Sequence, residues 1–285
     1  MQLFMDSSLI FIPDNEPVES ALSRTTHMGI GAHQDDLEIM ALHGILECFQ
    51  QEDKWFCGVT MTDGRGSPRD ALYKDFSDEE MRIVRRGEQN KAAVIGEYSA
   101  QIQLDYPSAF VKGENKAAVI SDLINLITAA KPTVIYTHNL ADKHDTHVGV
   151  TLRVIEALRQ MEPTNHPRNV YGCEVWRDLD WMIDEDKITF DVSAHENLQA
   201  ALLGVFDSQI SGGKRYDLAS MGRRRANATY FASHGTDLVT GMVYGIDLTP
   251  LVKNPDLDIK GFLDGFVQRT SEDIQTRLER LQVVS

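Results

Sequence analysis

Two clusters of histidine and aspartate hold the side chains of this sequence that could do chemistry. The stretch "AHQDD" contains His33, Asp35 and Asp36, and "THNLADKHDTH" contains His138, Asp142, His144, Asp145 and His147. A catalytic zinc site usually takes three ligands from His and Asp or Glu and leaves a fourth position to water. Zinc lowers the pKa of that water to about 7, and a neighbouring carboxylate can accept its proton. The clusters therefore predict a hydrolytic metal site. A further histidine could stabilise the oxyanion or protonate the leaving group.

The segments around the clusters alternate between short apolar strands and helical patterns. Strands are expected at 27–32, 55–62, 100–105, 133–137 and 169–176, and helices at 36–50, 77–96, 114–130 and 148–161. Ser77 and Glu80 have the spacing of a capping box, and the third helix stops before Pro132. This alternation predicts an α/β fold, a Rossmann-like and mostly parallel sheet with helices on both faces.

The polar clusters fall directly after expected strands. Residues 33–36 follow the first strand, 63–69 the second and 138–147 the fourth. Ligands of open α/β sheets bind outside the carboxyl ends of the strands. The three segments are therefore expected to border one crevice.

The last third of the chain is less regular. It has a helical pattern near 196–206, a basic helix within 213–230, a strand at 241–248 and an amphipathic helix after Ser271. The basic segment is interpreted as a solvated helix face. We expect one domain over 1–285, with a core at about 25–210 and a C-terminal elaboration at 211–285, which would suit an interface between copies in a homo-oligomer.

The bulk properties exclude several classes of protein. A net charge of −15 disfavours nucleic acid and anionic membranes as main partners. No apolar run is long enough to span a bilayer, and the N-terminus lacks the basic leader of a signal peptide. The three cysteines have no metal-binding spacing. These features predict a cytoplasmic protein that acts on a small molecule.

Four motifs together resemble one enzyme family. "GAHQDDLE" is similar to the A-H-P-D-D-E signature of the PIG-L/LmbE-like deacetylases, and "ADKHDTHVGV" to their second motif, D-x-H-P-D-H. "RRGEQNKAAVIG" resembles the family's R-x-x-E helix, and "DVSAHENLQAALLGVFDSQ" its late helix ending in H-x-S-Q. The motifs run in the family's order from about residue 31 to 209, which makes the resemblance more specific than any single motif.

The resemblance implies a zinc-dependent amidohydrolase that deacetylates an N-acetylglucosamine-type or related N-acyl substrate. A zinc-bound hydroxide would attack the amide, with one Zn²⁺ per chain, and the same ligands accept Fe²⁺. Carried over position by position, the family's roles are metal ligation by His33, Asp36 and His147, general base catalysis by Asp35, carbonyl polarisation and acid catalysis by His144, and substrate contact by Arg85.

The chain departs from the family pattern at several positions. Gln34 replaces a proline, and Thr146 replaces an aspartate that in the family often orients a neighbouring histidine, so that aspartate cannot hold the histidine ring in place here. Ser108 and Phe206 also differ, at positions expected on the rim of the site. His138 and Asp142 are expected to line the substrate pocket. The isolated His234 is expected to be exposed, with contact to the site from a late loop or a neighbouring subunit as the alternative.

The sequence has features of two other enzyme classes and is compatible with a non-enzymatic function. His33, Asp35 and His147 imitate the facial triad of non-haem iron enzymes, in which Asp35 rather than Asp36 would bind the metal. The pair His144-Asp145 is shared with HD phosphohydrolases, but those are all-helical, unlike the strand pattern here. A sugar-binding protein with a relic site is the non-enzymatic alternative, although no residue of the predicted machinery is missing.

Overall fold

The strands form one mixed sheet whose centre is parallel. The computed structural model describes residues 1–114 and 116–281, and its sheet has the order β1-β4-β3-β2-β5-β6-β8-β7. The five strands from β4 to β6 are parallel, whereas β1 and β8 run antiparallel to their neighbours β4 and β6. The strand bounds are β1 Leu9–Phe11, β2 His27–Gly31, β3 Phe56–Thr62, β4 Ala100–Tyr106, β5 Val134–His138, β6 Asn169–Cys173, β7 Ile188–Asp191 and β8 Met242–Asp247. The predicted fold class, α/β with a mostly parallel sheet, is confirmed.

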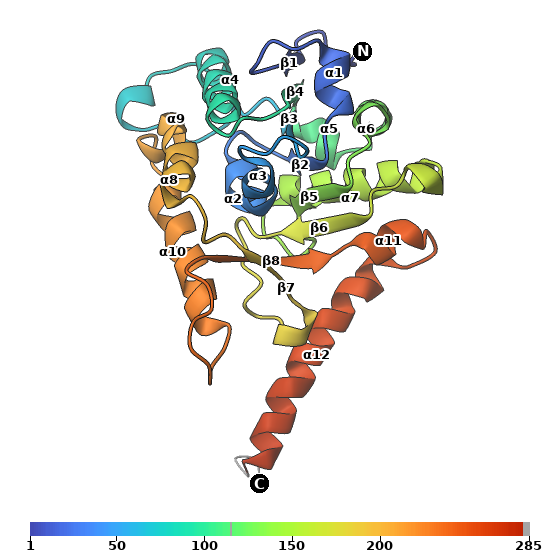
Figure 1. The fold of residues 1–285 in the computed structure, drawn as a ribbon, viewed down its shortest axis with the longest axis vertical. Helices are drawn as coiled ribbons and strands as arrows, with labels where there is room; N and C mark the ends of the chain where they lie inside the picture. The colour runs from blue at the N-terminus through green and yellow to red at the C-terminus, as the bar shows by residue number, and fades with distance from the viewer. Residues whose placement is uncertain (115, 282–285) are drawn as a thin grey trace.

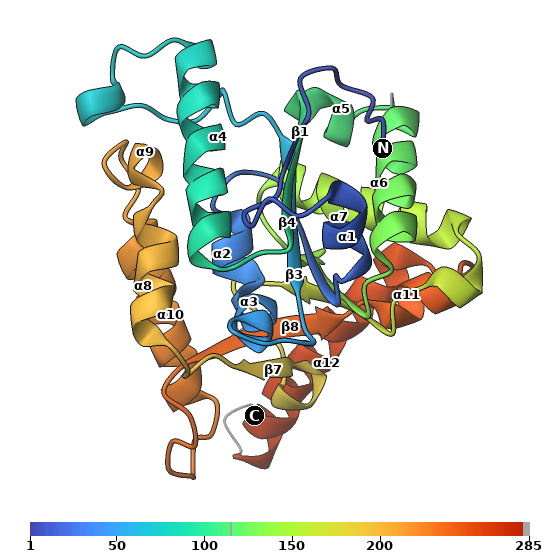
Figure 2. The ribbon, with the colours of Figure 1, turned by 45° about the horizontal axis from the view of Figure 1, so that its top comes forward.

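Helices cover both faces of the sheet, as Figures 1 and 2 show. One layer holds α2 (Asp36–Met40), α3 (Leu42–Cys48), α4 (Asp78–Ile95), α8 (Glu196–Gly204), α9 (Asp207–Ile210) and α10 (Tyr216–Tyr230). The other holds α1 (Val18–Ser23), α5 (Ser108–Lys112), α6 (Ala117–Ala130), α7 (Asp145–Gln160) and α11 (Thr249–Lys253). The last helix, α12 (Ile259–Arg280), extends away from both layers to the C-terminus (Figure 1). None of the helices in the described ranges is long and apolar enough to cross a membrane.

The central strands are buried on both faces, which explains their continuous apolar character. All seven residues of β3 are buried, and separate apolar clusters lie on the two sides of the sheet. Gly29 in β2 permits close packing of α2, because a Cβ there would stand 2.7 Å from the Phe56 ring and 3.0 Å from Leu37. The helix that carries the first acidic cluster therefore lies tightly against the strand that precedes it.

Several boundaries differ from the sequence-based expectation. The helix expected at 36–50 is two helices, because the backbone breaks at Ala41 (φ −99°, ψ 16°). The last helix begins at Ile259, well before Ser271, and its N-cap Asp258 accepts a bond from Gly261 N–H. Strands β1 and β7 were not predicted; they have three and four residues, too few for a clear alternating pattern. Strand β8, from the predicted C-terminal elaboration, joins the same sheet as the core strands.

Candidate active site

Two neighbouring parallel strands bring the two polar clusters together. Strands β2 and β5 pair in parallel, so the segments that follow them meet at one edge of the sheet. His33 and Asp36 come from the first segment and His147 from the start of α7. The Asp36 Oδ2 atom lies 3.2 Å from His33 Nδ1 and 3.4 Å from His147 Nε2, and the two histidine nitrogens are 3.2 Å apart. The three atoms thus form a nearly equilateral triangle.

That triangle has the dimensions of one face of a tetrahedral metal site. Ligand atoms about 2.0–2.1 Å from a tetrahedral zinc ion lie about 3.3 Å from one another. The protonation states also fit, because burial lowers the pKa of His33 to about 4 and keeps its imidazole neutral. Burial alone would raise the pKa of Asp36, but His147 and His138 beside it hold that pKa well below the usual range. The donor set therefore fits a divalent cation.

His138 lies next to the triangle, and with Asp36 and His147 it forms a second group close enough to share a metal. Its Nε2 atom accepts the Ala32 N–H at 2.9 Å, which occupies the lone pair that would face the metal. Its ring stacks on that of His147 with centroids 3.8 Å apart, and it is fully buried. The Asp36 Oδ2 atom stands 3.4 Å from the same Nε2. His138 thus supports the His147 ring from behind and is not among the residues that line the pocket.

Asp142 also lies behind the ligands and not in the pocket. Its Oδ2 is 3.4 Å from His147 Nδ1 and accepts the Trp176 N–H at 3.1 Å, while Oδ1 accepts the His144 N–H at 2.9 Å. Burial would raise the pKa of this carboxyl, but the contact with His147 lowers it below the usual range. A carboxylate on the outer nitrogen of a ligand histidine fixes its orientation and tautomer. Asp142 thus provides a carboxylate that can orient His147, although Thr146 replaces the family's aspartate.

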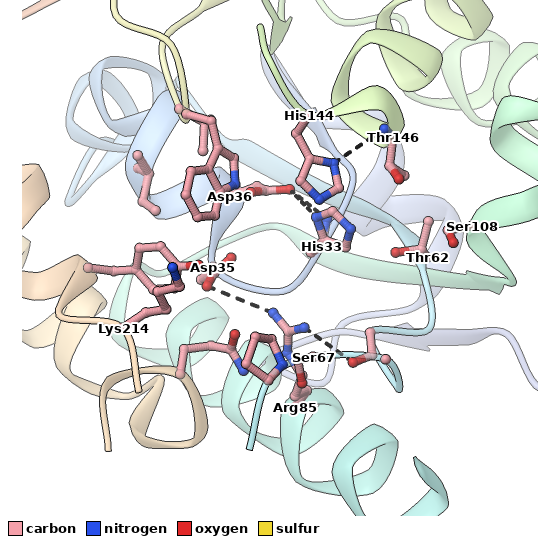
Figure 3. Close-up of a pocket in the computed structure, with 18 of the residues that line it drawn as sticks. His33, Asp35, Asp36, Thr62, Ser67, Arg85, Ser108, His144, Thr146 and Lys214 are labelled. Atoms are coloured by element: carbon pink, nitrogen blue, oxygen red, sulfur yellow. Dashed lines mark hydrogen bonds and ion pairs between the residues drawn. The ribbon is translucent and has the colours of Figure 1, made fainter. Parts of the chain in front are cut away.

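Asp35 stands beside the triangle with its carboxylate in the pocket (Figure 3). It occupies the N-cap position of α2, yet its side chain makes no capping bond. Burial raises the pKa of Asp35 well above the usual range; the Arg85 guanidinium opposes this rise, and the charge of Asp36 adds to it. The Asp35 backbone is left-handed, with φ 98° and ψ −28°, which for a residue with a Cβ costs on the order of 1–3 kcal/mol.

Arg85 is buried at the base of the pocket, and its guanidinium group donates its hydrogen bonds to backbone carbonyls. Its Nη2 donates to Gln34 O at 2.6 Å and its Nη1 to Gly64 O at 3.2 Å. The same Nη2 is 3.8 Å from Asp35 Oδ2. The guanidinium therefore holds two loops together and places a positive charge next to Asp35.

His144 faces the metal triangle from the N-cap of α7. Its Nδ1 accepts the Thr146 N–H at 3.3 Å, so the neutral ring carries its proton on Nε2. The His144 and His33 rings meet edge to face at 5.0 Å, and Figure 3 shows the His144 ring turned toward His33. Burial, with a smaller contribution from His147, lowers the pKa of His144. The ring is thus a neutral hydrogen-bond donor at neutral pH.

The pocket has a volume of about 440 Å³ and a rim that sequence reasoning missed. Trp176 and Tyr216 meet edge to face at 6.0 Å on this rim, and Lys214 Nζ lies 5.2 Å from the centre of the Trp176 ring. Lys112 and Gln209 also line it. Lys214 and Tyr216 open the basic segment 213–230, so that segment contributes to the pocket and is not only a solvated helix face. Its position after a long, irregular connection gave no signal of this.

Several other polar residues lie at the edge of the pocket or outside it. Asp63 accepts bonds from Arg65 N–H and Arg65 Nε within the glycine-rich loop, which it organises at the pocket's edge. His43 is half-buried, with its Nδ1 2.9 Å from the Tyr136 hydroxyl, as a packed core histidine. His234 is exposed and does not line the pocket. Ser108 and Thr146, two of the departures from the family pattern, do line it.

Comparison with known proteins adds a family and a fold. Residues 28–158 match the family model described as PIG-L: GlcNAc-PI de-N-acetylase. No curated protein matches the chain in a sequence search.

Three solved structures illustrate the fold. The chain is similar to GalB, the 4-carboxy-2-hydroxymuconate hydratase from Pseudomonas putida KT2440, at 15% identity and a TM-score of 0.62, over 79% of this chain and 95% of that one. It is similar to the N,N'-diacetylchitobiose deacetylase from Pyrococcus horikoshii at 16% identity and a TM-score of 0.56, over 78% of this chain and 83% of that one. It is also similar to the A40926 pseudoaglycone deacetylase Dbv21 at 15% identity and a TM-score of 0.55, over 78% of this chain and 96% of that one. At these identities the likeness establishes the fold alone.

Proposed function

We propose that this chain, whose residues 28–158 match the PIG-L family model, is a metal-dependent hydrolase that deacetylates an N-acetylglucosamine-type sugar or a related small N-acyl substrate. The observation that carries the proposal is the triangle of His33, Asp36 and His147, with the Asp35 carboxylate beside it in the same pocket. The fold alone would not select this reaction, because a hydratase shares it.

We propose zinc as the resident metal, one ion per chain, held by His33, Asp36 and His147. Two neutral imidazoles and a carboxylate with an open fourth position are the usual donor set of hydrolytic zinc sites. The same set accepts Fe²⁺. When bound, the metal would supply Lewis acidity to the amide carbonyl and lower the pKa of a water molecule at the site.

Asp35 is the general base of the proposed reaction. Its carboxylate lies outside the ligand triangle but in the same pocket, so it can take a proton from the attacking water and later pass it toward the leaving nitrogen. Burial favours protonation of this carboxyl, which suits a group that must hold a proton between the two steps. The adjacent Arg85 charge favours the anionic form before the reaction begins. Arg85 lines the pocket, which supports the proposal that it also contacts the substrate.

His144 stabilises the developing oxyanion. Because Thr146 N–H occupies its Nδ1, the proton sits on Nε2, where it can be donated to the carbonyl oxygen as negative charge develops. Pre-oriented donors of this kind act in a partly water-excluded pocket, where their electrostatic effect is larger than in bulk water.

The non-haem iron alternative is disfavoured by which aspartate lies with the histidines. Among the residues that the structure describes, two groups of side chains lie close enough to share a metal, and neither includes Asp35: one is His33, His144 and His147, the other Asp36, His138 and His147. A facial triad of His33, Asp35 and His147 would require the reverse. The relic-site alternative is disfavoured because the proposed base and two of the proposed ligands, His33 and Asp36, line a pocket of substrate size. The third proposed ligand, His147, lies within 3.4 Å of both.

The test combines metal analysis with acetate release. We expect about one zinc per chain, release of acetate from N-acetylglucosamine or its simple conjugates, and loss of activity on chelation. In the Asp35→Asn variant the metal should remain while kcat falls by about 100-fold or more, the usual size of a general-base contribution. Near-normal turnover of this variant would refute the role of Asp35, and absence of bound metal in the wild type would refute the proposal itself.

A further inference from the structure

One face of α4 holds both ends of the peptide bond that precedes the Asp35 side chain. The carbonyl of this peptide, Gln34 O, accepts the Arg85 Nη2–H at 2.6 Å. Its N–H, that of Asp35, donates to Gln89 Oε1 at 3.2 Å. Residues four apart on a helix lie on the same face, so Arg85 and Gln89 reach the peptide from one side of α4. Together they fix the plane of a single peptide unit.

This peptide needs external support because of the conformation of Asp35. A φ of 98° is unfavourable for a residue with a Cβ, and such a conformation persists only when the surroundings hold it. Glycine, the usual occupant of this region, would lack the carboxylate that the site needs. A rotation of this peptide would turn the Asp35 carboxylate away from the triangle of His33, Asp36 and His147.

The orientation of the Gln89 amide is set by a deeper acidic residue. Gln89 Nε2 donates to Glu38 Oε1 at 2.8 Å, and the Tyr98 hydroxyl donates to the same oxygen at 2.8 Å. A second acceptor, Gln101 Oε1, lies 3.4 Å from Gln89 Nε2. Because acceptors stand on the amino side of this amide, its oxygen faces the Asp35 N–H. Gln89 and Glu38 are both fully buried.

We infer that Gln89 is a positioning residue for the general base and acts through the backbone of Asp35. It does not line the pocket and therefore does not contact the substrate. The inference rests on the proposed function in one respect, the role of Asp35 as the base. It predicts that loss of the Gln89 acceptor lowers turnover without affecting metal or substrate binding.

The kinetic test replaces the amide by an apolar side chain of similar length. In Gln89→Met we expect kcat to fall about 10- to 100-fold, the usual cost of misplacing a catalytic group by up to 1 Å. KM and bound zinc should stay within about twofold of wild type. The matched control is Gln199→Met, since Gln199 is equally buried and makes three side-chain hydrogen bonds, none to residues 33–36. The melting temperature of Gln199→Met should fall about as much as that of Gln89→Met, whereas Gln199→Met should keep the kcat of wild type.

A second readout measures the Asp35 amide directly. Hydrogen exchange followed by NMR should be slow at the Asp35 N–H in wild type and at least 10-fold faster in Gln89→Met. Gln89→Glu keeps an acceptor oxygen and should retain most of the protection and most of kcat. Fast exchange in wild type, or kcat of Gln89→Met equal to that of the control, would overturn the inference. If wild type releases no acetate, the proposed function fails, and the exchange measurement still decides the role of Gln89.

Discussion

The floor and the rim of the pocket are built in different ways. The floor comes from residues that follow β2 and β5, adjacent parallel strands of the sheet, and its proposed ligand atoms lie within 3.2–3.4 Å of one another. The rim comes from the segment after β6, the start of α10 with the residues before it, and the end of α5. It consists of the aromatic pair Trp176 and Tyr216, with Lys214 near the Trp176 ring and Lys112 also lining the pocket. From this contrast we expect the floor to perform the proposed reaction and the rim to select the substrate.

The difference extends to how each part is supported. Every floor residue has buried partners behind it, such as His138 stacked beneath His147 and Asp142 bonded to its outer nitrogen. On the rim, Lys214 is exposed, and its ammonium group lies 5.2 Å from the centre of the Trp176 ring. Substitutions in the floor should therefore change metal content and turnover, whereas substitutions in the rim should change substrate affinity.

The largest expected effect is that of His147→Ala. It removes one corner of the ligand triangle, and two remaining ligands do not hold zinc at a hydrolytic site. Metal analysis of the purified variant should find almost no zinc, and acetate release should be lost with it. His43→Ala is the matched control, because His43 is a half-buried helix histidine bonded to Tyr136 outside the site. A full equivalent of metal in His147→Ala would contradict the ligand assignment.

An intermediate effect is expected for Asp142→Asn, which tests the support behind the floor. The amide can still accept backbone N–H groups, but it no longer offers a charged acceptor to His147 Nδ1. Zinc affinity, measured by competition with a chromophoric chelator, should fall about 10- to 100-fold, as for other outer-shell carboxylates. Asp122→Asn is the control, since Asp122 is also buried and hydrogen-bonded but does not line the pocket. An unchanged affinity would mean that stacking on His138 alone orients the ligand.

The floor was largely predictable from sequence for a physical reason. Apolar strands can be recognised from their composition, and polar residues that follow neighbouring parallel strands meet at one edge of the sheet. His33, Asp36 and His147 were therefore expected to lie together. The family resemblance then assigned their roles, and the matched model covers this region, residues 28–158. What the pattern did not reveal is that His138 and Asp142 lie behind the ligands, because burial of a polar side chain depends on tertiary packing.

The rim was not predictable for an equally physical reason. Trp176 lies beyond the end of β6, where the expected strand had been extended to 176, and Lys214 and Tyr216 lie at the start of α10 after two short helices. Neither position follows a periodic rule that would aim it at the sheet's edge. Gln89 was likewise hidden, because a glutamine on an amphipathic helix gives no sign of the backbone bond that it accepts.

The smallest expected effect is that of Lys214→Ala on the rim. Removing one exposed polar contact with a bound ligand costs about 0.5–1.5 kcal/mol, which corresponds to a rise of about 2- to 10-fold in KM. Steady-state kinetics should find kcat within about twofold of wild type and the zinc content unchanged, because Lys214 touches the Trp176 ring and none of the ligands. Lys260→Ala on α12, outside the pocket, provides the exposed-lysine control. A fall in kcat with KM unchanged would instead place Lys214 in the chemical step, and the separation of floor from rim would then be wrong.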